Sequence, residues 1–179
     1  MQLFIGYHGT SKQNAINILK TSFTIDYKKI GWLGTGIYFY EENSEMAVEW
    51  ALYKCKSAPK DVIRSEIKIP AEEVFDVSIP GSKDNRFFHE LRRKLVEVEL
   101  SKKNLDITVK NKKDFDGKTY NFICKTKGYK LVRAFTYTYT DQDRSTGLDS
   151  RVPNGIELCL KQPSYVQTKD SIYAKEDLI

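Results

Sequence analysis

The first stretch whose residues could form a functional site runs from Gly31 to Ala51. Glycines and aromatic residues are closely spaced in it. Three glycines precede the short aromatic run Ile37–Tyr40, a pattern that predicts a tight turn feeding a strand. The residues that follow predict a helix capped by Ser44, with Trp50 at the edge of its apolar stripe. A glycine turn, an aromatic strand and a flanking indole would make a slot suited to a flat, electron-poor ring. Taken alone, the same pattern also fits an ordinary hydrophobic core.

A histidine and a glutamate near the two ends of the chain are the other candidates. A predicted strand over residues 2–7 delivers His8 into the turn at 8–11, and a position at a strand end beside glycine favours a ligand role. Glu157 lies on the predicted strand Ile156–Lys161, on the face opposite to its apolar side chains. The ordinary interpretations of these two residues are a turn histidine bonded to backbone and an exposed carboxylate.

With these stretches in order, the chain resembles the ADP-ribosyltransferases of the poly(ADP-ribose) polymerase and diphtheria-toxin type, which carry a His, a Tyr and a Glu on three separated strands. Tyr-His-Gly-Thr at 7–10 is similar to the family's His-Gly-Ser/Thr motif. Gly-Thr-Gly-Ile-Tyr-Phe at 34–39 is similar to its Gly-x-Gly-Ile-Tyr-Phe motif. Glu157 stands as far before Pro163-Ser164 as the family's Glu stands before its Pro-Ser. The three motifs span nearly the whole chain.

The resemblance implies a role for each of these residues. His8 would hydrogen-bond the adenosine ribose of NAD, and the backbone of Gly9 would meet the nicotinamide carboxamide. The ring of Tyr38 would stack on nicotinamide, and Trp50, or in its place Tyr53, would close the other face. The expected catalytic residues are then Glu157, His8 and Tyr38, and the expected NAD-binding residues are His8, Gly9, Thr10, Gly36, Tyr38 and Trp50.

The role implied for Glu157 follows from the bond that breaks. Loss of nicotinamide builds oxocarbenium character on the ribose, and a carboxylate bonded to the ribose hydroxyls orients and stabilises that cation. In the family, the loop before this Glu helps to recognise the acceptor. Gly155 stands two residues before Glu157, where arginine-modifying relatives carry Glu or Gln, so an arginine side chain is not the expected acceptor.

Length and composition limit the classes of protein that the chain can belong to. Its 179 residues, 40% hydrophobic and 30% charged, suit one domain with a hydrophobic core. No segment has the apolar length of a membrane span or a secretory signal, so we expect a cytoplasmic protein without membrane contact. Three cysteines without CxxC spacing and two histidines argue against a metal site or a disulfide framework. NAD, as co-substrate, is the only cofactor expected.

Basic charge is concentrated between Lys102 and Arg133. This segment holds ten basic residues against three aspartates, a net charge of +7, whereas the whole chain carries +5. Aromatic residues are interleaved with the lysines, a mixture that surfaces binding phosphates and bases use. A solvated lysine-rich face is the alternative, because few of the basic residues are arginine. The segment favours RNA or DNA over protein as the acceptor.

We expect a single α+β domain over residues 1–179, with a split antiparallel β-sheet, the NAD cleft between its halves, and flanking helices. Alternating apolar residues predict a strand over 63–69 and a long antiparallel strand over Leu131–Thr140. A helix is predicted over 84–100, the residues 141–154 read as turn-rich, and Tyr165 begins a stretch that should supply a last strand.

The expected function is mono-ADP-ribosyl transfer from NAD with release of nicotinamide. So small a transferase resembles toxins and defence effectors, for which an antitoxin or inhibitor protein is a candidate partner. Three alternatives stay open: NAD hydrolysis, a transferase that modifies protein, and a catalytically silent module that binds NAD, ADP-ribose or nucleic acid. The presence of Glu157 argues against the silent module, because silent relatives tend to lose that residue.

Overall fold

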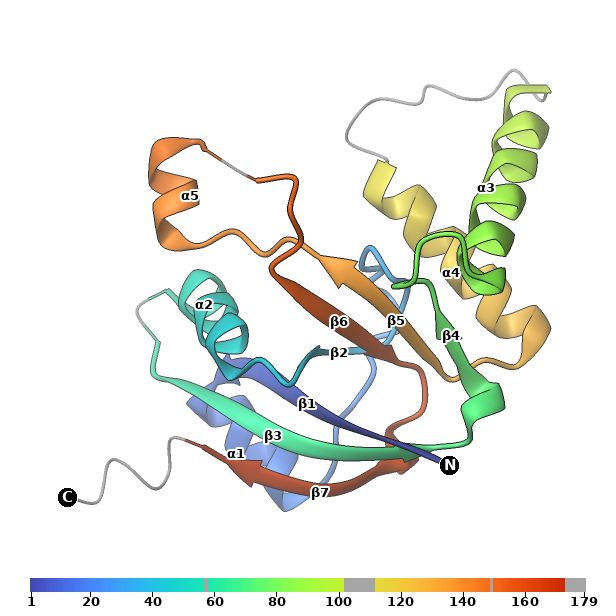
Figure 1. Cartoon of the computed structure of the whole chain (residues 1–179). Coiled ribbons are helices and arrows are strands. Elements are labelled where there is room, and N and C mark those ends of the chain that lie inside the picture. Colours follow the sequence, from blue (N-terminus) through green and yellow to red (C-terminus); the bar gives the residue numbers. More distant parts are fainter. Residues whose placement is uncertain (57, 102–111, 149, 173–179) are drawn as a thin grey trace.

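In a computed structural model of the chain, the described residues, 1–56, 58–101, 112–148 and 150–172, form an α+β fold with seven strands and five α-helices. The helices flank a single sheet, whose strands lie in the order β4-β5-β6-β2-β1-β3-β7 (Figure 1). The strands are β1 (Gln2–Ser11), β2 (Ile37–Glu41), β3 (Lys60–Ile69), β4 (Val74–Asp76), β5 (Leu131–Thr136), β6 (Gly155–Leu160) and β7 (Val166–Ser171). The helices are α1 (Lys12–Lys20), α2 (Ser44–Cys55), α3 (Lys83–Ser101), α4 (Lys112–Lys127) and α5 (Asp141–Thr146), and 3₁₀ turns cover Ala71–Glu73 and Pro163–Tyr165.

Pairing in the sheet is mostly antiparallel and is weakest in the middle. The prediction of an antiparallel sheet is wrong at one edge, where β4 and β5 run parallel because α3 and α4 form a crossover between them. Strands β1 and β3 pair over their whole length, from Gln2 to Ser11. Strands β1 and β2 pair only at Gly6 and Tyr7. The two halves of the sheet therefore meet through a short junction.

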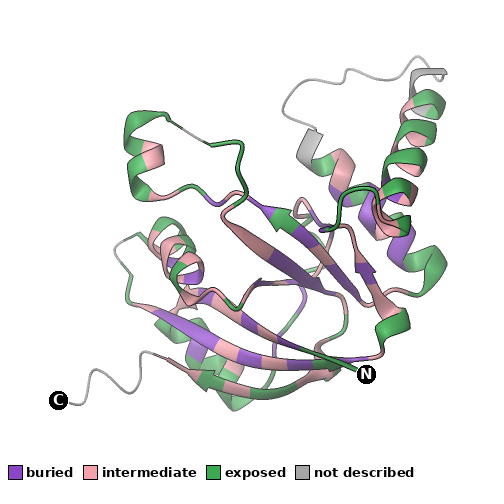
Figure 2. Cartoon of the chain, in the orientation of Figure 1, coloured by how far each residue is buried: buried purple, intermediate pink, exposed green. Residues whose placement is uncertain are grey.

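Helices cover both faces of the sheet. On one face, α1 packs Ala15 against a core that includes Phe39 and Ile67. On the other, α2 covers β1 and β3 with Ala47, while α3 and α4 cover β4 and β5 with Phe88 and Ile123. Buried residues follow the strands, whereas α3 and α5 are largely exposed (Figure 2). The inner strands of the sheet thus have both faces covered in part.

Three local predictions are wrong. Helix α2 is capped by Asn43, whose side chain accepts from Met46 N at 3.0 Å, and not by Ser44. The residues 8–11, predicted as a turn, belong to strand β1 and pair with β3. Helix α4 occupies much of the basic segment, for which we predicted no element. The turn-rich residues contain α5, which Thr140 begins with a capping box and Gly147 ends in the left-handed conformation.

The long strand predicted over Leu131–Thr140 also ends early, at Thr136. Beyond it, the Asn154 side chain bonds both backbone groups of Thr138, donating to the carbonyl and accepting from the N–H, each at 2.8 Å. A side chain therefore takes the hydrogen bonds that a neighbouring strand would supply. Phe135 faces outward and is 48% exposed, while Thr136 and Thr138 are buried.

Candidate active site

The three predicted catalytic residues lie on three strands that are neighbours in the sheet. Strand β2 stands between β1, which carries His8, and β6, which carries Glu157. In the register of β2 and β6, Tyr38 is opposite Cys159 and Tyr40 is opposite Glu157. Paired residues share a face of a sheet, and residues two apart do too. Tyr38, Tyr40 and Glu157 therefore project from the same face.

Glu157 is buried, not the exposed carboxylate that a strand glutamate usually is. Its side chain is 9% exposed and receives a hydrogen bond at each oxygen. The indole Nε1 of Trp32 donates to Oε2 at 2.8 Å, and the hydroxyl of Thr136 donates to Oε1 at 2.8 Å. An ionised carboxylate only accepts, so two donors that face its two oxygens suit the charged form.

Tyr38 is fixed by its hydroxyl to the glycine-rich residues 29–36, which we call the glycine loop. The hydroxyl donates to Gly34 O at 2.7 Å and accepts from Leu33 N at 2.9 Å. Gly31 lies directly against it, because a Cβ there would stand 2.2 Å from the Tyr38 hydroxyl oxygen. Burial raises the pKa of Tyr38 far above its ordinary range, so this hydroxyl stays protonated and serves as a structural donor.

Further groups brace the same loop from α4 and from Lys161, the residue that follows β6. The ammonium of Lys161 donates to the carbonyls of Leu33 and Thr35, at 2.7 and 2.9 Å. The side-chain oxygen of Asn121 accepts from Thr35 N at 2.8 Å. Gly117 of α4 lies so close that a Cβ there would stand 2.1 Å from the Gly31 carbonyl. The loop that carries Trp32 is therefore held from three directions.

His8 lies where β1 and β2 stop pairing. Its Nδ1 is 2.8 Å from the Tyr38 carbonyl oxygen, so the imidazole takes a hydrogen bond that the ladder leaves open at this point. A carbonyl can only accept, which places the proton on Nδ1 and leaves Nε2 as an acceptor in the neutral ring. Burial lowers the pKa of His8, although the backbone hydrogen bond opposes the shift. The imidazole is consequently neutral at physiological pH, and its ring meets Phe23 and Phe39 edge to face.

The small residues of the two motifs serve close packing. Gly9 lies under α2, because a Cβ there would stand 1.9 Å from the Ala47 carbonyl oxygen. A Cβ at Gly36 would stand 2.7 Å from the Leu160 carbonyl oxygen on β6. Thr10, also predicted to bind NAD, contacts α1 through Asn14 Nδ2 at 3.5 Å. The fold itself thus requires glycine at 9 and 36.

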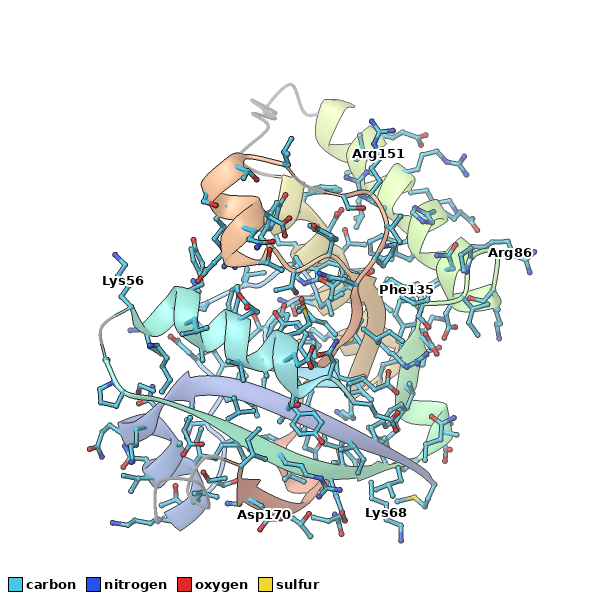
Figure 3. The ribbon with its side chains drawn as sticks, turned by 60° about the vertical axis from the view of Figure 1, so that its left-hand side comes forward. Lys56, Lys68, Arg86, Phe135, Arg151 and Asp170 are labelled. Carbon is cyan, nitrogen blue, oxygen red and sulfur yellow. The ribbon has the colours of Figure 1, made fainter. Side chains whose placement is uncertain are left out.

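Trp50 and Tyr53 lie together on α2, on the side that turns toward α5. Their ring centroids are 5.9 Å apart, and their exposed fractions are 37% and 48%. Lys54 Nζ stands 4.9 Å from the Trp50 ring, and the Arg144 guanidinium of α5 stands 4.2 Å from the Tyr53 ring. Figure 3 views this side, where α2 crosses in front of β1 and β3 with the α5 residues above it. A cation therefore lies over each of the two rings, and the structure leaves open which of them would cover nicotinamide.

Sequence reasoning missed the residues that surround Glu157. Trp32 stands inside the glycine motif, yet nothing local connects it with a carboxylate 125 positions away. Tyr40 was predicted only as a strand aromatic, and its hydroxyl accepts from Thr138 at 3.1 Å beside Glu157. Burial raises the pKa of Tyr40 above its ordinary range, and the nearby charge of Glu157 adds to the shift. The threonine positions that alternate along Thr136–Thr140 were the one available signal.

The described residues contain no group of three or more His, Cys, Asp or Glu side chains placed to hold a metal ion. No helix among them is long and apolar enough to cross a membrane. A cavity of about 350 Å³ lies on the far side of α2, lined by Lys12, Val48, Ala51, Leu52, Pro59, Lys60 and Val62, and none of the predicted site residues lines it.

Comparison with known proteins finds a relative in an archaeon. The chain is 27% identical over 184 aligned residues to an uncharacterized protein of Methanocaldococcus jannaschii, and the match covers 90% of this chain and 83% of that protein. No family model matches the chain. No solved structure matches it.

Proposed function

We propose that this protein is a mono-ADP-ribosyltransferase that uses NAD, releases nicotinamide and modifies a macromolecule. The observation that carries the proposal is the buried Glu157 carboxylate, hydrogen-bonded at both oxygens and opposite Tyr40 on the neighbouring strand. His8 and Tyr38, the other two motif residues, are joined by a hydrogen bond on the adjoining strands. The resemblance in sequence is thus supported by closeness in space for Tyr38 and Glu157, whereas the His8 ring packs against Phe23 and Phe39 on the other face of the sheet.

The proposed fold is the split-sheet ADP-ribosyltransferase fold. Its support is the short junction between β1 and β2, which pair only at Gly6 and Tyr7. Past that junction, the His8 imidazole bonds the Tyr38 backbone in place of a ladder partner. The two strands are therefore free to diverge at the position where the motif residues stand, and a dinucleotide would enter between the halves.

The reaction would proceed at the anomeric carbon of the nicotinamide ribose. The C–N bond breaks and its electron pair leaves with nicotinamide, which departs as a neutral molecule. Glu157, bonded to ribose hydroxyls, stabilises the positive charge that develops on the ring. A lone pair of the acceptor then forms the new bond at the same carbon, and the acceptor loses a proton.

His8, Tyr38 and Trp50 would bind the dinucleotide. In its neutral form, His8 presents Nε2 as an acceptor for a ribose hydroxyl, because the Tyr38 carbonyl holds the Nδ1 proton. The Tyr38 ring would support nicotinamide from below, and Trp50 would cover it from α2. Stacking of this kind contributes on the order of 0.5 to 1.5 kcal/mol per pair beyond burial.

For the acceptor, we favour RNA or DNA over protein. Much of the basic segment lies outside the described residues, including Lys102, Lys103 and Lys110. Within α4, Lys118, Phe122 and Lys125 fall at i, i+4 and i+7, and all three are exposed, Phe122 by 48%. A lysine–aromatic–lysine stripe offers contacts to phosphates and a surface for base stacking.

The acceptor surface and the reaction site are connected through α4. Gly117 and Asn121 of this helix contact the glycine loop, which carries Trp32 and hence borders Glu157. A strand of nucleic acid bound along α4 would therefore run toward the carboxylate. A toxin or defence effector is the proposed setting, with an antitoxin or inhibitor protein as its partner.

The test is incubation with NAD labelled in the adenylate moiety, in the presence of separate pools of protein, RNA and DNA. We expect release of nicotinamide and label on the nucleic-acid pools. Label on protein would move the acceptor to that class, and nicotinamide release without transferred label would make the protein an NAD hydrolase. If NAD stayed intact with every pool, the proposal that the protein is an enzyme would be contradicted, and a binding module would be the remaining interpretation.

Substitution of the stripe tests the acceptor separately. In the double variant Lys118→Glu/Lys125→Glu, labelling of nucleic acid should fall while cleavage of NAD in water continues. Affinity for a single strand should fall by about 0.7 log unit per phosphate contact for each tenfold rise in salt. Lys12→Glu/Lys20→Glu, on α1, is the matched control of equal charge change. Equal labelling by both double variants would assign the stripe to a solvated face.

A further inference from the structure

Trp32, which is not part of the family motifs, holds the carboxylate of Glu157, the proposed catalytic group. The Trp32 indole reaches Glu157 from the glycine loop, a separation of 125 residues, and donates to Oε2 at 2.8 Å. We propose that Trp32 is a positioning residue that fixes the Glu157 carboxylate in the orientation the reaction needs. The catalytic part of this inference rests on the proposed function, whereas the structural part does not.

The geometry explains why a carboxylate here needs a second element to hold it. The last torsion of a glutamate side chain is broad, so a carboxylate bonded at one oxygen can still rotate. Thr136, at the end of β5, fixes Oε1, and Trp32, from the loop before β2, fixes Oε2. Donors from two different elements define the plane of the group, as a site that must hold its reacting atoms within about 0.5 Å requires.

Trp32 is suited to this role because its own position does not depend on Glu157. The residues beside it in the loop are bonded to Tyr38, Lys161 and Asn121. Its ring packs against the core cluster beneath α3 and α4, which includes Leu33 and Phe75. An indole N–H can only donate, and here it points at Oε2 of Glu157. The loop thus presents one fixed donor to the carboxylate.

The first test observes the hydrogen bond without any reaction. The chain has two tryptophans, so a protein labelled with ¹⁵N-tryptophan gives two indole N–H signals, which Trp32→Phe assigns. We expect the Trp32 signal to be protected from exchange with solvent and to move in Glu157→Gln, while the Trp50 signal stays in place. A Trp32 signal that exchanges as fast as that of Trp50 and ignores Glu157→Gln would overturn the inference.

The second test measures the contribution to turnover. Trp32→Phe keeps an aromatic ring and removes the donor, so kcat for NAD cleavage should fall about tenfold to a hundredfold, the equivalent of one hydrogen bond to a charged group. The KM for NAD should change little, because the ring still fills its place in the core. At Thr136, the isosteric Thr136→Val should lower kcat in the same way and Thr136→Ser should restore it.

A double-mutant cycle separates positioning from simple damage to the fold. If Trp32 acts through Glu157, Trp32→Phe should have almost no further effect on turnover in the Glu157→Gln protein. Additive losses, or a raised KM with kcat unchanged, would show that Trp32 acts by another route and would contradict the inference. If the wild-type protein leaves NAD intact, the proposed function fails, and the indole signal still decides whether Trp32 holds Glu157.

Discussion

The two elements that border Glu157 are built in different ways. The glycine loop is bonded to distant parts of the chain, through Tyr38, Lys161 and Asn121. The residues 137–148 and 150–154, which we call the α5 segment, are held mainly by bonds among themselves, such as the capping box of Thr140 with Asp143. Their apolar side chains include Leu148 and Val152, each 72% exposed.

This contrast separates two tasks. A group that must meet the ribose in one orientation gains from a support that is fixed by the core, because small misplacements cost rate. A surface that meets a macromolecule can vary without disturbing the core, since changes in its local bonds remain local. We therefore expect substitutions in the glycine loop to affect cleavage of NAD, and substitutions in the α5 segment to leave cleavage of NAD in water largely unchanged.

The largest effect should come from Glu157, where the two elements meet. Glu157→Gln keeps the shape and one acceptor but removes the charge, so cleavage of NAD should fall at least about a hundredfold. Binding of NAD, measured by calorimetry, should persist, and so should the circular dichroism spectrum. Glu45→Gln, an exposed residue on α2, is the matched control. Unchanged turnover in Glu157→Gln would remove the mechanism as written.

The next prediction compares two glycines, Gly117, which contacts the glycine loop, and Gly147, which ends α5. Gly117→Ala places a Cβ 2.1 Å from the Gly31 carbonyl, so α4 or the loop must move, at a net cost of about 1 to 3 kcal/mol. Gly147 has φ of +69° and open space around it, so Gly147→Ala strains only the end of α5, by about 1 kcal/mol.

Urea unfolding with a parallel NAD assay distinguishes these two variants. Gly117→Ala should lower both stability and turnover, because it displaces the loop that carries Trp32. Gly147→Ala should lower stability slightly and leave cleavage of NAD in water near the wild-type rate. Equal losses of turnover in the two would end the distinction between the two elements.

A smaller effect should separate the two roles of Tyr38. Tyr38→Phe keeps the ring and leaves the Leu33 N–H without its acceptor, which should cost about 1 to 3 kcal/mol of stability. NAD affinity should remain within about twofold, because stacking needs only the ring. Tyr38→Ala should lose the affinity as well, by roughly 1 to 3 kcal/mol. Wild-type affinity in Tyr38→Ala would mean that nicotinamide binds elsewhere.

Local sequence patterns predicted the elements that depend on residues close to one another in the sequence. Strand β3 alternates from Ile63 to Ile69, and both of these side chains are fully buried, because one face of an antiparallel strand pairs with the core. Ser11 caps α1 as predicted, because its hydroxyl accepts from Asn14, only three residues later. Strand β6 was likewise predicted within a residue at each end.

Other errors have a different cause, which is a contact with a distant residue. Strand β5 ends at Thr136 because Asn154 takes the backbone bonds of Thr138, and no alternation of side chains can show that. Trp32 was not predicted as a site residue for the same reason, because its partner Glu157 lies 125 positions away in the sequence. Helix α4 was not predicted because Gly117 interrupts it and its apolar residues show only a weak helical period, while its burial comes from packing against β4, β5 and α3.

The smallest expected effect is a dependence of stability on pH through His8. Its pKa in the folded protein is lowered from 6.5, so below pH 6.5 the unfolded chain binds a proton that the folded chain resists. Stability therefore falls as the pH drops below 6.5 and stops falling once the folded imidazole is protonated too. Above pH 6.5 both states are neutral at this residue, and the full contribution is present.

His8→Gln removes this titration while an amide can still donate to the Tyr38 carbonyl. Urea midpoints at pH 5, 6 and 7.5 should therefore rise more steeply with pH in the wild-type protein than in the variant. The effects of all groups that the two proteins share, His89 included, cancel in this difference. The affinity for NAD should follow the same direction, because a protonated imidazole has no acceptor at Nε2 to offer a ribose hydroxyl. Parallel curves for the two proteins would show that His8 is not buried at the junction of β1 and β2, and would contradict its proposed place in the site.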